Sequence, residues 1–178
     1  MTATKDPLEF YKHCPRCGGE LTVKPHHEEK AKLICQKCGF VFHQHPTAAV
    51  FALITNNQDE LLLVKRRFPP HKNSWDVPGG FIEIGEEAEK AVIREIKEEI
   101  NVVFRPAKIL GTYHDWYEHK GLYYSVINIG FVGDISGLPN AGSDASAVDW
   151  HSLSKLPLEI YFNYITRSIN DLIKSKDT

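Results

Sequence analysis

Hydrophobic positions change their spacing along the chain, and these changes predict where the strands and helices lie. Residues 48–54 (AAVFALI) and 61–64 (LLLV) are short apolar runs typical of buried strands, and residues 56–59 between them have the composition of a turn. Over residues 86–100 the spacing becomes helical, which predicts an amphipathic helix. Its apolar side is formed by Ala88, Ala91, Val92, Ile96 and Ile100.

The second half of the chain continues this mixture of strands and helices. Residues 102–117 and 122–132 are predicted strands around a turn at 118–121, and residues 148–150 form a last short strand. Residues 160–173 are predicted to form a closing helix. Its apolar side consists of Tyr161, Ile165, Ile169 and Leu172. Because strands and helices are interleaved irregularly, we expect an α/β or α+β sandwich with a mixed sheet, and not a regular βαβ series.

The first 45 residues differ from the rest because they contain all four cysteines of the chain. The cysteines form two CxxC turns, each followed by glycine, and thiolates in tight turns suit tetrahedral Zn²⁺. About 40 residues rarely bury enough apolar surface to fold unaided. We therefore predict a zinc ribbon over residues 1–45 and a second domain over residues 46–178. The predicted ligands of the structural Zn²⁺ are Cys14, Cys17, Cys35 and Cys38.

Two alternatives for the cysteines are a redox dithiol and a pair of disulfides. Neither requires two CxxC turns with glycine after both, so zinc is favoured. A ribbon of this kind either binds nucleic acid or protein, or packs on a neighbouring domain. Its mixed local charge favours packing.

Composition narrows the classes of protein further. The 178 residues are 42% hydrophobic and 25% charged, with a formal net charge of −2, as in an ordinary globular protein. This charge disfavours nucleic acid as a partner, although a local basic patch stays open. No apolar run approaches the roughly 20 residues that span a bilayer, and the N-terminus has no apolar segment after a basic start. We expect a cytoplasmic protein without a membrane partner.

The predicted helix over residues 86–100 carries a stripe of acid. Glu95, Glu98 and Glu99 stand at positions i, i+3 and i+4, so they share one face. Three like charges repel each other, and a divalent cation would turn them into a binding site, since Mg²⁺ prefers carboxylate oxygens. The alternative is a solvated acidic face. It is disfavoured by the preceding Pro-Gly-Gly turn and by Arg94, whose distance from Glu86 predicts an ion pair between loop and helix.

At these positions the chain resembles the Nudix hydrolase family. The family pattern is G-x5-E-x7-R-E-U-x-E-E-x-G-U, in which U is a bulky aliphatic residue. The positions that fill it are Gly80, Glu86, Arg94, Glu95, Ile96, Glu98, Glu99 and Val102. Asn101 stands where the family has glycine. Because Asn is the next best residue for a left-handed helix cap, we expect the turn to be preserved.

The resemblance implies a Nudix-type α/β/α sandwich that hydrolyses a diphosphate by attack of a metal-activated water. The implied ligands of Mg²⁺ or Mn²⁺ are Glu95, Glu98, Glu99 and the Gly79 carbonyl. Catalytic roles fall to Glu95, Glu98, Glu99 and Arg94. Arg94 would orient Glu95, while Gly80 and Glu86 would be structural. The general base stays open among Glu98, Glu118 and Asp144.

The substrate is less well specified by the sequence. A zinc ribbon before a Nudix domain resembles NADH pyrophosphatases, but their Ser-Gln-Pro-Trp-Pro-Phe-Pro signature is absent, and residues 111–119 (GTYHDWYEH) stand in its place. Residues 141–150 resemble ADP-ribose pyrophosphatase-like members. We therefore expect a small nucleotide substrate, with ADP-ribose first and NADH or NAD⁺ second. Candidate substrate contacts are Arg66, Trp116, Tyr117 and Asp144.

Three further expectations remain open. One is removal of a nucleotide cap, such as an NAD cap, from RNA. Another, from a different class, is a non-catalytic protein that senses a nucleotide and binds a partner; the complete set of carboxylates disfavours it. By analogy with the family, we also expect a homodimer.

Overall fold

The computed structural model describes residues 11–26, 29–119, 122–142 and 144–176. The chain divides into two compact units, one made of Met1–Pro46 with Trp116–Ser125, the other of Thr47–Asp115 with Val126–Thr178. The sequence predicts a boundary after residue 45, and the first unit's N-terminal segment ends at Pro46. This unit also includes Trp116–Ser125, which the sequence did not assign to it. Lys120 and Gly121 of the predicted turn lie outside the described residues.

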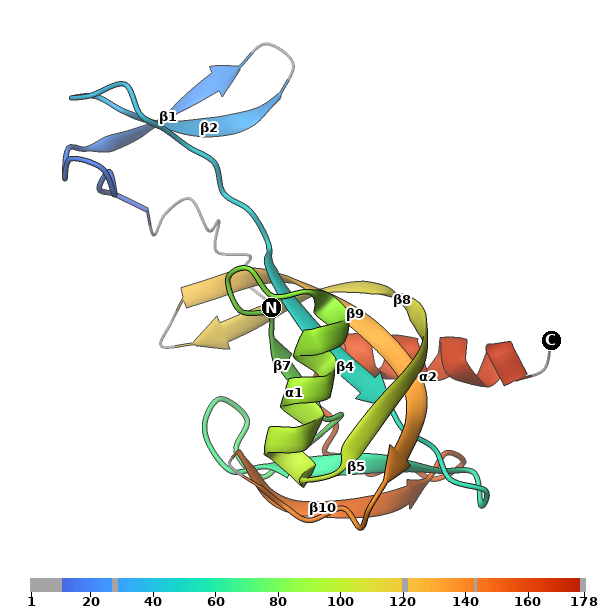
Figure 1. The fold of residues 1–178 in the computed structure, drawn as a ribbon. Helices are drawn as coiled ribbons and strands as arrows, with labels where there is room; N and C mark the ends of the chain where they lie inside the picture. Colours follow the sequence, from blue (N-terminus) through green and yellow to red (C-terminus); the bar gives the residue numbers. More distant parts are fainter. Residues whose placement is uncertain (1–10, 27–28, 120–121, 143, 177–178) are drawn as a thin grey trace. The chain divides into compact units, whose positions relative to one another are not determined.

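The first unit contains a small antiparallel sheet in the order β1-β2-β3 (Figure 1). The strands are β1 (Leu21–His26), β2 (Glu29–Cys35) and β3 (Val41–Phe42). The sequence pattern did not predict them. Among the residues of this unit whose burial is described, four form the buried core, namely Cys14, Leu21, Leu33 and Cys35. Two of these four are cysteines, so the apolar core is small and the cysteines are central to it.

The second unit is built on two sheets (Figure 1). In the order β7-β4-β9-β8, β4 pairs with β9 in parallel and with β7 antiparallel, so this sheet is mixed. The other sheet has the order β10-β5-β6 and is antiparallel. The strands are β4 (Thr47–Leu53), β5 (Glu60–Arg66), β6 (Trp75–Asp76), β7 (Gly79–Phe81), β8 (Val103–His119), β9 (Leu122–Ser136) and β10 (Ala145–Ser152).

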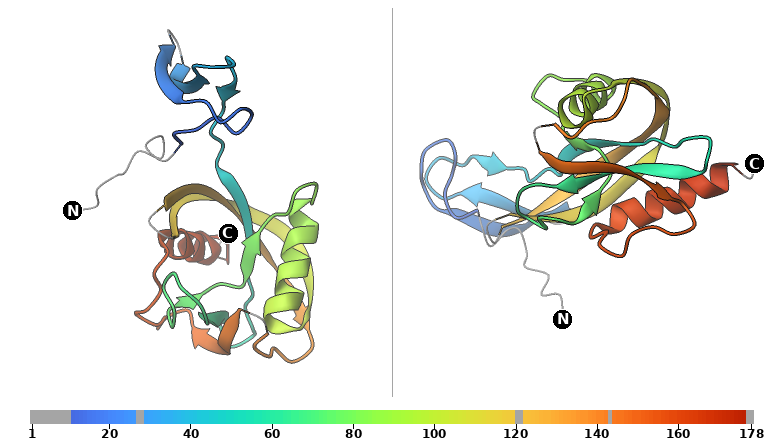
Figure 2. Two further views of the ribbon diagram at one scale, coloured as in Figure 1. Left: turned by 90° about the vertical axis from the view of Figure 1, so that its left-hand side faces the viewer. Right: turned by 90° about the horizontal axis from the view of Figure 1, so that it is seen from below.

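Strand β4 is buried on both faces from Ala49 to Leu53, where a helix covers each side. Val50 and Ala52 belong to the core that contains the apolar side of α1 (Ala88–Ile100). The ring of Phe51, which alternates with them, lies 5.0 Å from the ring of Tyr164 in α2 (Asn163–Lys176). Successive side chains of a strand point to opposite faces. The two helices lie on opposite sides of the strands (Figure 2), which confirms the α/β/α sandwich with a mixed sheet.

Helix α1 follows its sequence pattern closely. Its buried residues are Ala91, Val92, Ile96 and Ile100. It begins at Ala88, two residues later than predicted, and ends at Ile100. The cap residue Asn101 that follows has the left-handed angles φ 55° and ψ 34°. The Asn101 N–H donates to the Lys97 carbonyl at 3.1 Å. The predicted left-handed cap at Asn101 is confirmed.

The closing helix begins later than predicted. It begins at Asn163, so Tyr161 lies outside it, is 59% exposed, and stacks on His71 with ring centroids 3.3 Å apart. The prediction that Tyr161 belongs to the apolar side of the helix was therefore wrong. The other predicted positions, Ile165, Ile169 and Leu172, are buried.

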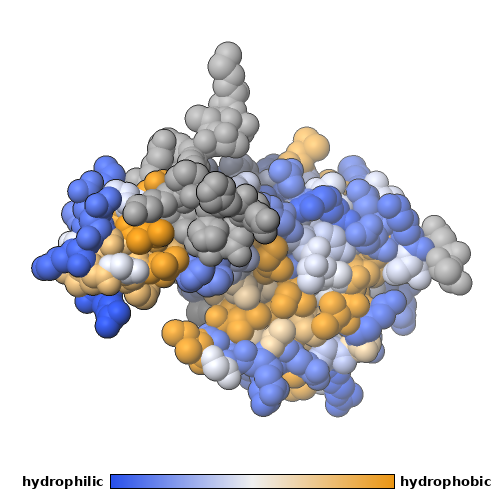
Figure 3. Space-filling view, turned by 90° about the horizontal axis from the view of Figure 1, so that it is seen from above, coloured by the Kyte–Doolittle hydropathy of each residue, from blue (hydrophilic) through white to orange (hydrophobic). Residues whose placement is uncertain are grey.

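The surface of the described residues carries scattered hydrophobic side chains. Ile84 and Leu158 are almost fully exposed, and Phe68 is about half exposed. On the face seen in Figure 3, orange residues gather in patches that are bordered by blue ones. Within the described part of the chain, no helix is both long enough and apolar enough to cross a membrane.

Candidate active site and metal centres

Three carboxylates follow one face of α1 and differ in exposure. The Glu95 side chain is 15% exposed and the Glu98 side chain 53%. Glu99 lies at the last turn of the helix, where one of its carboxylate oxygens accepts a hydrogen bond from the Gly79 N–H at 2.9 Å. The helix spacing therefore produces the stripe that was predicted, and β7 contributes a backbone partner to it.

Arg94 connects this stripe to the loop before the helix. Its Nε and Nη2 atoms donate to the two oxygens of Glu86, both at 2.8 Å, and its Nη1 donates to Glu95 at 2.8 Å. Nη2 also donates to the Phe81 carbonyl at 3.1 Å. These bonds from Arg94 lower the pKa of Glu86 to about 2. The predicted ion pair between loop and helix is confirmed, and a two-pronged bond of this kind fixes geometry as well as charge.

Gly79 and Gly80 allow backbone and carboxylates to approach closely. A Cβ atom on Gly79 would lie 2.2 Å from the Val50 carbonyl oxygen, so no side chain fits against β4. A Cβ atom on Gly80 would lie between 2.4 and 2.5 Å from the carboxylate of Glu95. The two glycines, which begin β7, therefore let the backbone lie directly beside the acidic stripe.

Negative charge is concentrated around Glu99. Its pKa is raised to about 8, mainly by burial and also by the carboxylates of Asp76, Glu95 and Asp144, while the Gly79 N–H opposes the shift. Burial also raises the pKa of Glu95. Several carboxylates with little water around them disfavour their own ionised forms. A divalent cation would relieve that repulsion.

The loop before β10 holds Asp144 close to this charge. The Gly142 N–H donates to the Glu99 carbonyl at 2.7 Å, and the Asn140 N–H to the Ile100 carbonyl at 3.0 Å. The Arg67 N–H donates to the Asp144 carbonyl at 2.9 Å. The structure therefore brings Asp144, which was predicted from the sequence, towards the end of α1.

The other candidate substrate contacts have different surroundings. Arg66 donates to Asp76 at 3.0 Å and to the Pro70 carbonyl at 3.0 Å, so part of its guanidinium binds protein. Trp116 and Tyr117 belong to the first unit, whereas Glu95 belongs to the second. Trp116 is 44% exposed.

Asp76 is a buried residue of this site that sequence reasoning missed. It is 6% exposed, and it accepts hydrogen bonds from Arg66, from the Tyr164 hydroxyl at 3.0 Å and from the Val77 N–H at 2.9 Å. Burial raises its pKa, although Arg66 opposes this. Its position just before Pro-Gly-Gly was a signal, but a single aspartate in a short strand has no distinctive spacing.

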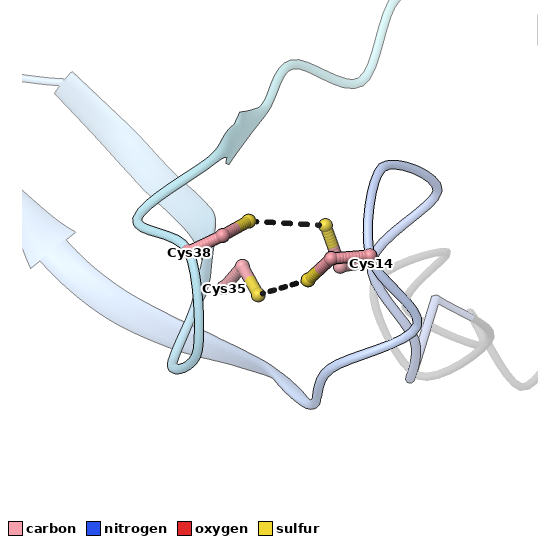
Figure 4. A group of neighbouring side chains, drawn as sticks. Cys14, Cys35 and Cys38 are labelled. Carbon is pink, nitrogen blue, oxygen red and sulfur yellow. Dashed lines mark hydrogen bonds between the residues drawn. The ribbon is translucent and has the colours of Figure 1, made fainter.

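The four cysteines form a closed cluster in the first unit (Figure 4). Their sulfur atoms all lie within 4.8 Å of one another. The Sγ atoms of Cys14 and Cys38 are 3.8 Å apart, and those of Cys17 and Cys35 are 3.5 Å apart. Sulfurs bound at about 2.3 Å to a tetrahedral ion are separated by about 3.8 Å. The cluster therefore fits Zn²⁺.

Both CxxC turns have the same backbone geometry. Gly18 and Gly39 have φ of 71°, and each N–H donates to the carbonyl of the first cysteine of its turn, at 2.9 and 3.0 Å. A hydrogen bond from the Cys38 N–H is the main cause that lowers the pKa of Cys35 to about 6. Positive φ favours glycine, which explains the glycine after each pair.

The two clusters differ in how tightly their ligand atoms gather. Among the described residues, only the four cysteines form a group of three or more such atoms this close together. Glu95 and Glu98 instead lie against Arg94, at 2.8 and 3.5 Å, and Glu99 lies against Gly79. The carboxylates share a face without converging on one point.

This chain has a mixed α/β/α sandwich and an acidic helix that follows a Pro-Gly-Gly segment, which is the arrangement of the Nudix class of fold. The chain belongs to the Nudix hydrolase family, since residues 45–169 match the NUDIX domain.

Several known proteins are similar to this chain. An ADP-ribose pyrophosphatase of Methanocaldococcus jannaschii is 39% identical over 114 residues, which cover 64% of this chain and 66% of that protein. NAD-capped RNA hydrolase NudC of Pseudomonas aeruginosa is 27% identical over 163 residues, which cover 89% of this chain but 54% of that protein. The crystal structure of a NUDIX hydrolase from Nitrosomonas europaea, 24% identical, superposes with a TM-score of 0.73 over 93% of this chain and 92% of its own.

Proposed function

We propose that this chain is a metal-dependent diphosphohydrolase that cleaves the pyrophosphate bond of a nucleoside diphosphate derivative, with ADP-ribose as the preferred substrate. The observation that carries this proposal is the acidic stripe of α1, which Arg94 and the Gly79 backbone hold in place. The relative with 39% identity, named ADP-ribose pyrophosphatase, supports the choice of substrate.

Mg²⁺ or Mn²⁺ would be held by Glu95, Glu98, Glu99 and the Gly79 carbonyl. The donor set fits, because hard divalent cations take carboxylate and carbonyl oxygens. When bound, such an ion lowers the pKa of a water molecule and neutralises charge on the diphosphate.

The protein's own groups have separable tasks in this reaction. Arg94 donates to one oxygen of Glu95 and thereby orients that carboxylate. The Gly79 N–H orients Glu99. Glu98 has the most exposed carboxylate of the three, so it is suited to accept a proton from the attacking water as the new oxygen–phosphorus bond forms. Asp144 is a second candidate for this proton transfer.

The products follow from the chemistry of the bond. Water attacks one phosphorus of the diphosphate, the bond from that phosphorus to the bridging oxygen breaks, and each half leaves with one phosphate. From ADP-ribose these halves are AMP and ribose 5-phosphate. We also propose that Cys14, Cys17, Cys35 and Cys38 bind one structural Zn²⁺, which completes the small core of the first unit.

A second candidate function is hydrolysis of NAD-capped RNA. The observation that favours it is coverage: the match to NudC extends over 89% of this chain, whereas the match to the ADP-ribose pyrophosphatase extends over 64%. Strong dependence of turnover on salt, with preference for capped RNA over free NAD⁺, would support it.

The test is a substrate screen with Mg²⁺ or Mn²⁺ that includes ADP-ribose, NADH, NAD⁺, FAD, coenzyme A, dinucleoside polyphosphates, nucleoside triphosphates and NAD-capped RNA. Products are resolved by chromatography. Glu99→Gln should lower kcat by about 10²- to 10³-fold, the loss typical of one electrostatic group at a reaction centre.

Glu89→Gln is the matched control, because it makes the same change in the exposed first turn of the same helix. It should leave kcat unchanged. Turnover that survives Glu99→Gln would refute the assignment. Tight nucleotide binding without turnover by the wild-type protein would favour the non-catalytic sensor.

A further inference from the structure

A cluster of three polar side chains, two of them buried, lies directly before the Pro-Gly-Gly segment in the chain's path. Arg66 at the end of β5, Asp76 in β6 and Tyr164 in α2 meet there, and three separate elements thus supply one cluster. Arg66 and the Tyr164 hydroxyl each donate to Asp76 at 3.0 Å, to different oxygens of the carboxylate. Asp76 is 6% exposed and Tyr164 is 9% exposed.

Stability alone is a weak reason for this cluster. An ion pair taken out of water gains little net free energy, and apolar residues of the same volume often stabilise as well or better. Buried polar groups with every bond satisfied do, however, specify one arrangement of the chain. The cluster is therefore expected to fix the position of something near it.

The cluster holds the backbone segment that runs from Asp76 to Gly79, beside the acidic stripe. Asp76 accepts the Val77 N–H at 2.9 Å, and the Pro78 carbonyl accepts the Ala52 N–H at 2.9 Å. One residue later, the Gly79 N–H donates to Glu99. The segment from Asp76 to Gly79 is thus held at one end by the buried cluster and at the other by β4 and the carboxylate.

We infer that Arg66, Asp76 and Tyr164 form a positioning triad that holds the Gly79 backbone against Glu99. The triad acts through the position of Gly79. This inference rests on the proposed function for its catalytic consequence, but the geometry of Gly79 can be measured without turnover.

Two tyrosines provide a matched pair of variants. Tyr113 in β8 and Tyr164 in α2 both pack on the Phe51 ring, with centroids 5.9 and 5.0 Å away, and each hydroxyl donates to an aspartate. The partner of Tyr113 is Asp171, which lies on α2 and is about half exposed. Tyr164→Phe and Tyr113→Phe therefore delete the same group from similar surroundings, but only one deletion affects Asp76.

The first readout is amide hydrogen exchange by NMR on the 178-residue chain purified with zinc. In Tyr164→Phe, the Gly79 N–H should exchange about tenfold faster, the factor expected when one hydrogen bond of the supporting network is lost. The Leu62 N–H, which donates to the Ile54 carbonyl at 2.9 Å within the core, reports global unfolding and serves as the reference. In Tyr113→Phe, Gly79 should change no more than Leu62 does.

The second readout is kinetic. Tyr164→Phe should lower kcat by about 10- to 100-fold and raise the Mg²⁺ concentration for half-maximal rate, with KM for the nucleotide little changed, because a displaced catalytic group slows the reaction more than binding. Tyr113→Phe should keep the wild-type kcat. The triad is overturned if Gly79 exchange relative to Leu62 is the same in both variants, or if the wild-type protein is active and both variants have equal kcat.

Failure of the proposed function looks different. A wild-type protein that hydrolyses none of the screened substrates refutes the diphosphohydrolase, and Gly79 exchange in the two variants then decides alone whether the triad exists.

Discussion

The cysteine cluster and the acidic stripe of α1 present metal-binding side chains in two contrasting ways. In the cluster, each CxxC turn is closed by its own backbone bond, from Gly18 to Cys14 and from Gly39 to Cys35, and four sulfurs meet within 4.8 Å. In the stripe, a helix sets the spacing, and the partners that orient the carboxylates come from elsewhere, such as the Gly79 N–H.

This difference matches two uses of a metal. Four thiolates fill a tetrahedral shell and leave no position for a substrate, so such a site contributes to folding. Carboxylates that do not converge, one of them about half exposed, leave room for water and phosphate oxygens. A closed site is thus built from local turns, and an open one from a helix and a distant backbone segment.

The largest effect should come from breaking the closed site. Cys17→Ser should release zinc and unfold β1–β3, because structural zinc supplies on the order of 10 kcal/mol of folding free energy in small domains. Zinc content and the NMR signals of residues 11–42 measure this, while the signals of α1 should persist. His13→Ser, at an exposed neighbour of Cys14, is the control and should retain zinc. Stoichiometric zinc in Cys17→Ser would contradict the four-cysteine site.

The open site should respond to a single methyl group. Gly80→Ala places a Cβ atom 2.4 to 2.5 Å from the Glu95 carboxylate. Because this carboxylate is the far end of a flexible side chain, it will shift. We expect kcat/KM to fall about 100-fold while the melting temperature changes little, since a displacement near 1 Å has that effect on catalysis. Gly111→Ala in β8, where the nearest atom is the Tyr113 hydroxyl, should keep activity. Equal activities of the two variants would contradict the close approach.

The open site should also make stability depend on pH. The folded protein raises the pKa of Glu99 from 4.5 to about 8, so its protonated form is favoured. That contribution is complete below pH 4.5 and is lost as pH rises towards 8. In magnesium-free buffer, wild-type protein should lose stability relative to Glu99→Gln across this window, by roughly 1.4 kcal/mol per pH unit at most. Urea unfolding measures it, and a difference independent of pH would be the contrary result.

The smallest effect concerns the end of the helix that carries the stripe. Asn101 has φ 55° and accepts a hydrogen bond from Lys97 at 2.8 Å. Asn101→Ala should lower the free energy of unfolding by about 1 kcal/mol, because alanine resists left-handed angles. Asn101→Gly adopts the left-handed angles more easily but loses the hydrogen bond from Lys97. Its free energy of unfolding should stay within about 0.5 kcal/mol of the wild-type value. Chemical denaturation distinguishes them, and equal losses would mean that φ is unimportant here.

Much of the fold could be predicted because its signals are local. Helix α1 and its cap at Asn101 follow from helical spacing, and β4 follows from one apolar run. The error at Tyr161 has a tertiary cause. The preceding residues pair with β6, since Trp75 forms a parallel bridge with Ile160 and donates to the Glu159 carbonyl at 3.1 Å. This pairing keeps the segment extended and delays the helix to Asn163.

The contacts of the candidate site also divide into local ones, which the sequence predicted, and long-range ones, which it did not. The family pattern predicted the ion pair between Arg94 and Glu86 and a role for Arg94 beside Glu95, because these residues lie within nine positions of one another in the chain. It gave no sign of Asp76 and Tyr164, which lie 88 positions apart. No spacing rule reaches across such a separation.

The amino-acid sequence by itself determined the order of the carboxylates along one helical face and the pairing of cysteines within each turn. The repeat of a helix and the geometry of a tight turn are properties of neighbouring residues. Only the tertiary structure decided that Gly79 meets Glu99, that Glu99 is partly buried near other carboxylates, and that Arg66 and Tyr164 share Asp76. Those contacts join segments that are distant in the chain, and they form only when the sheets and helices pack.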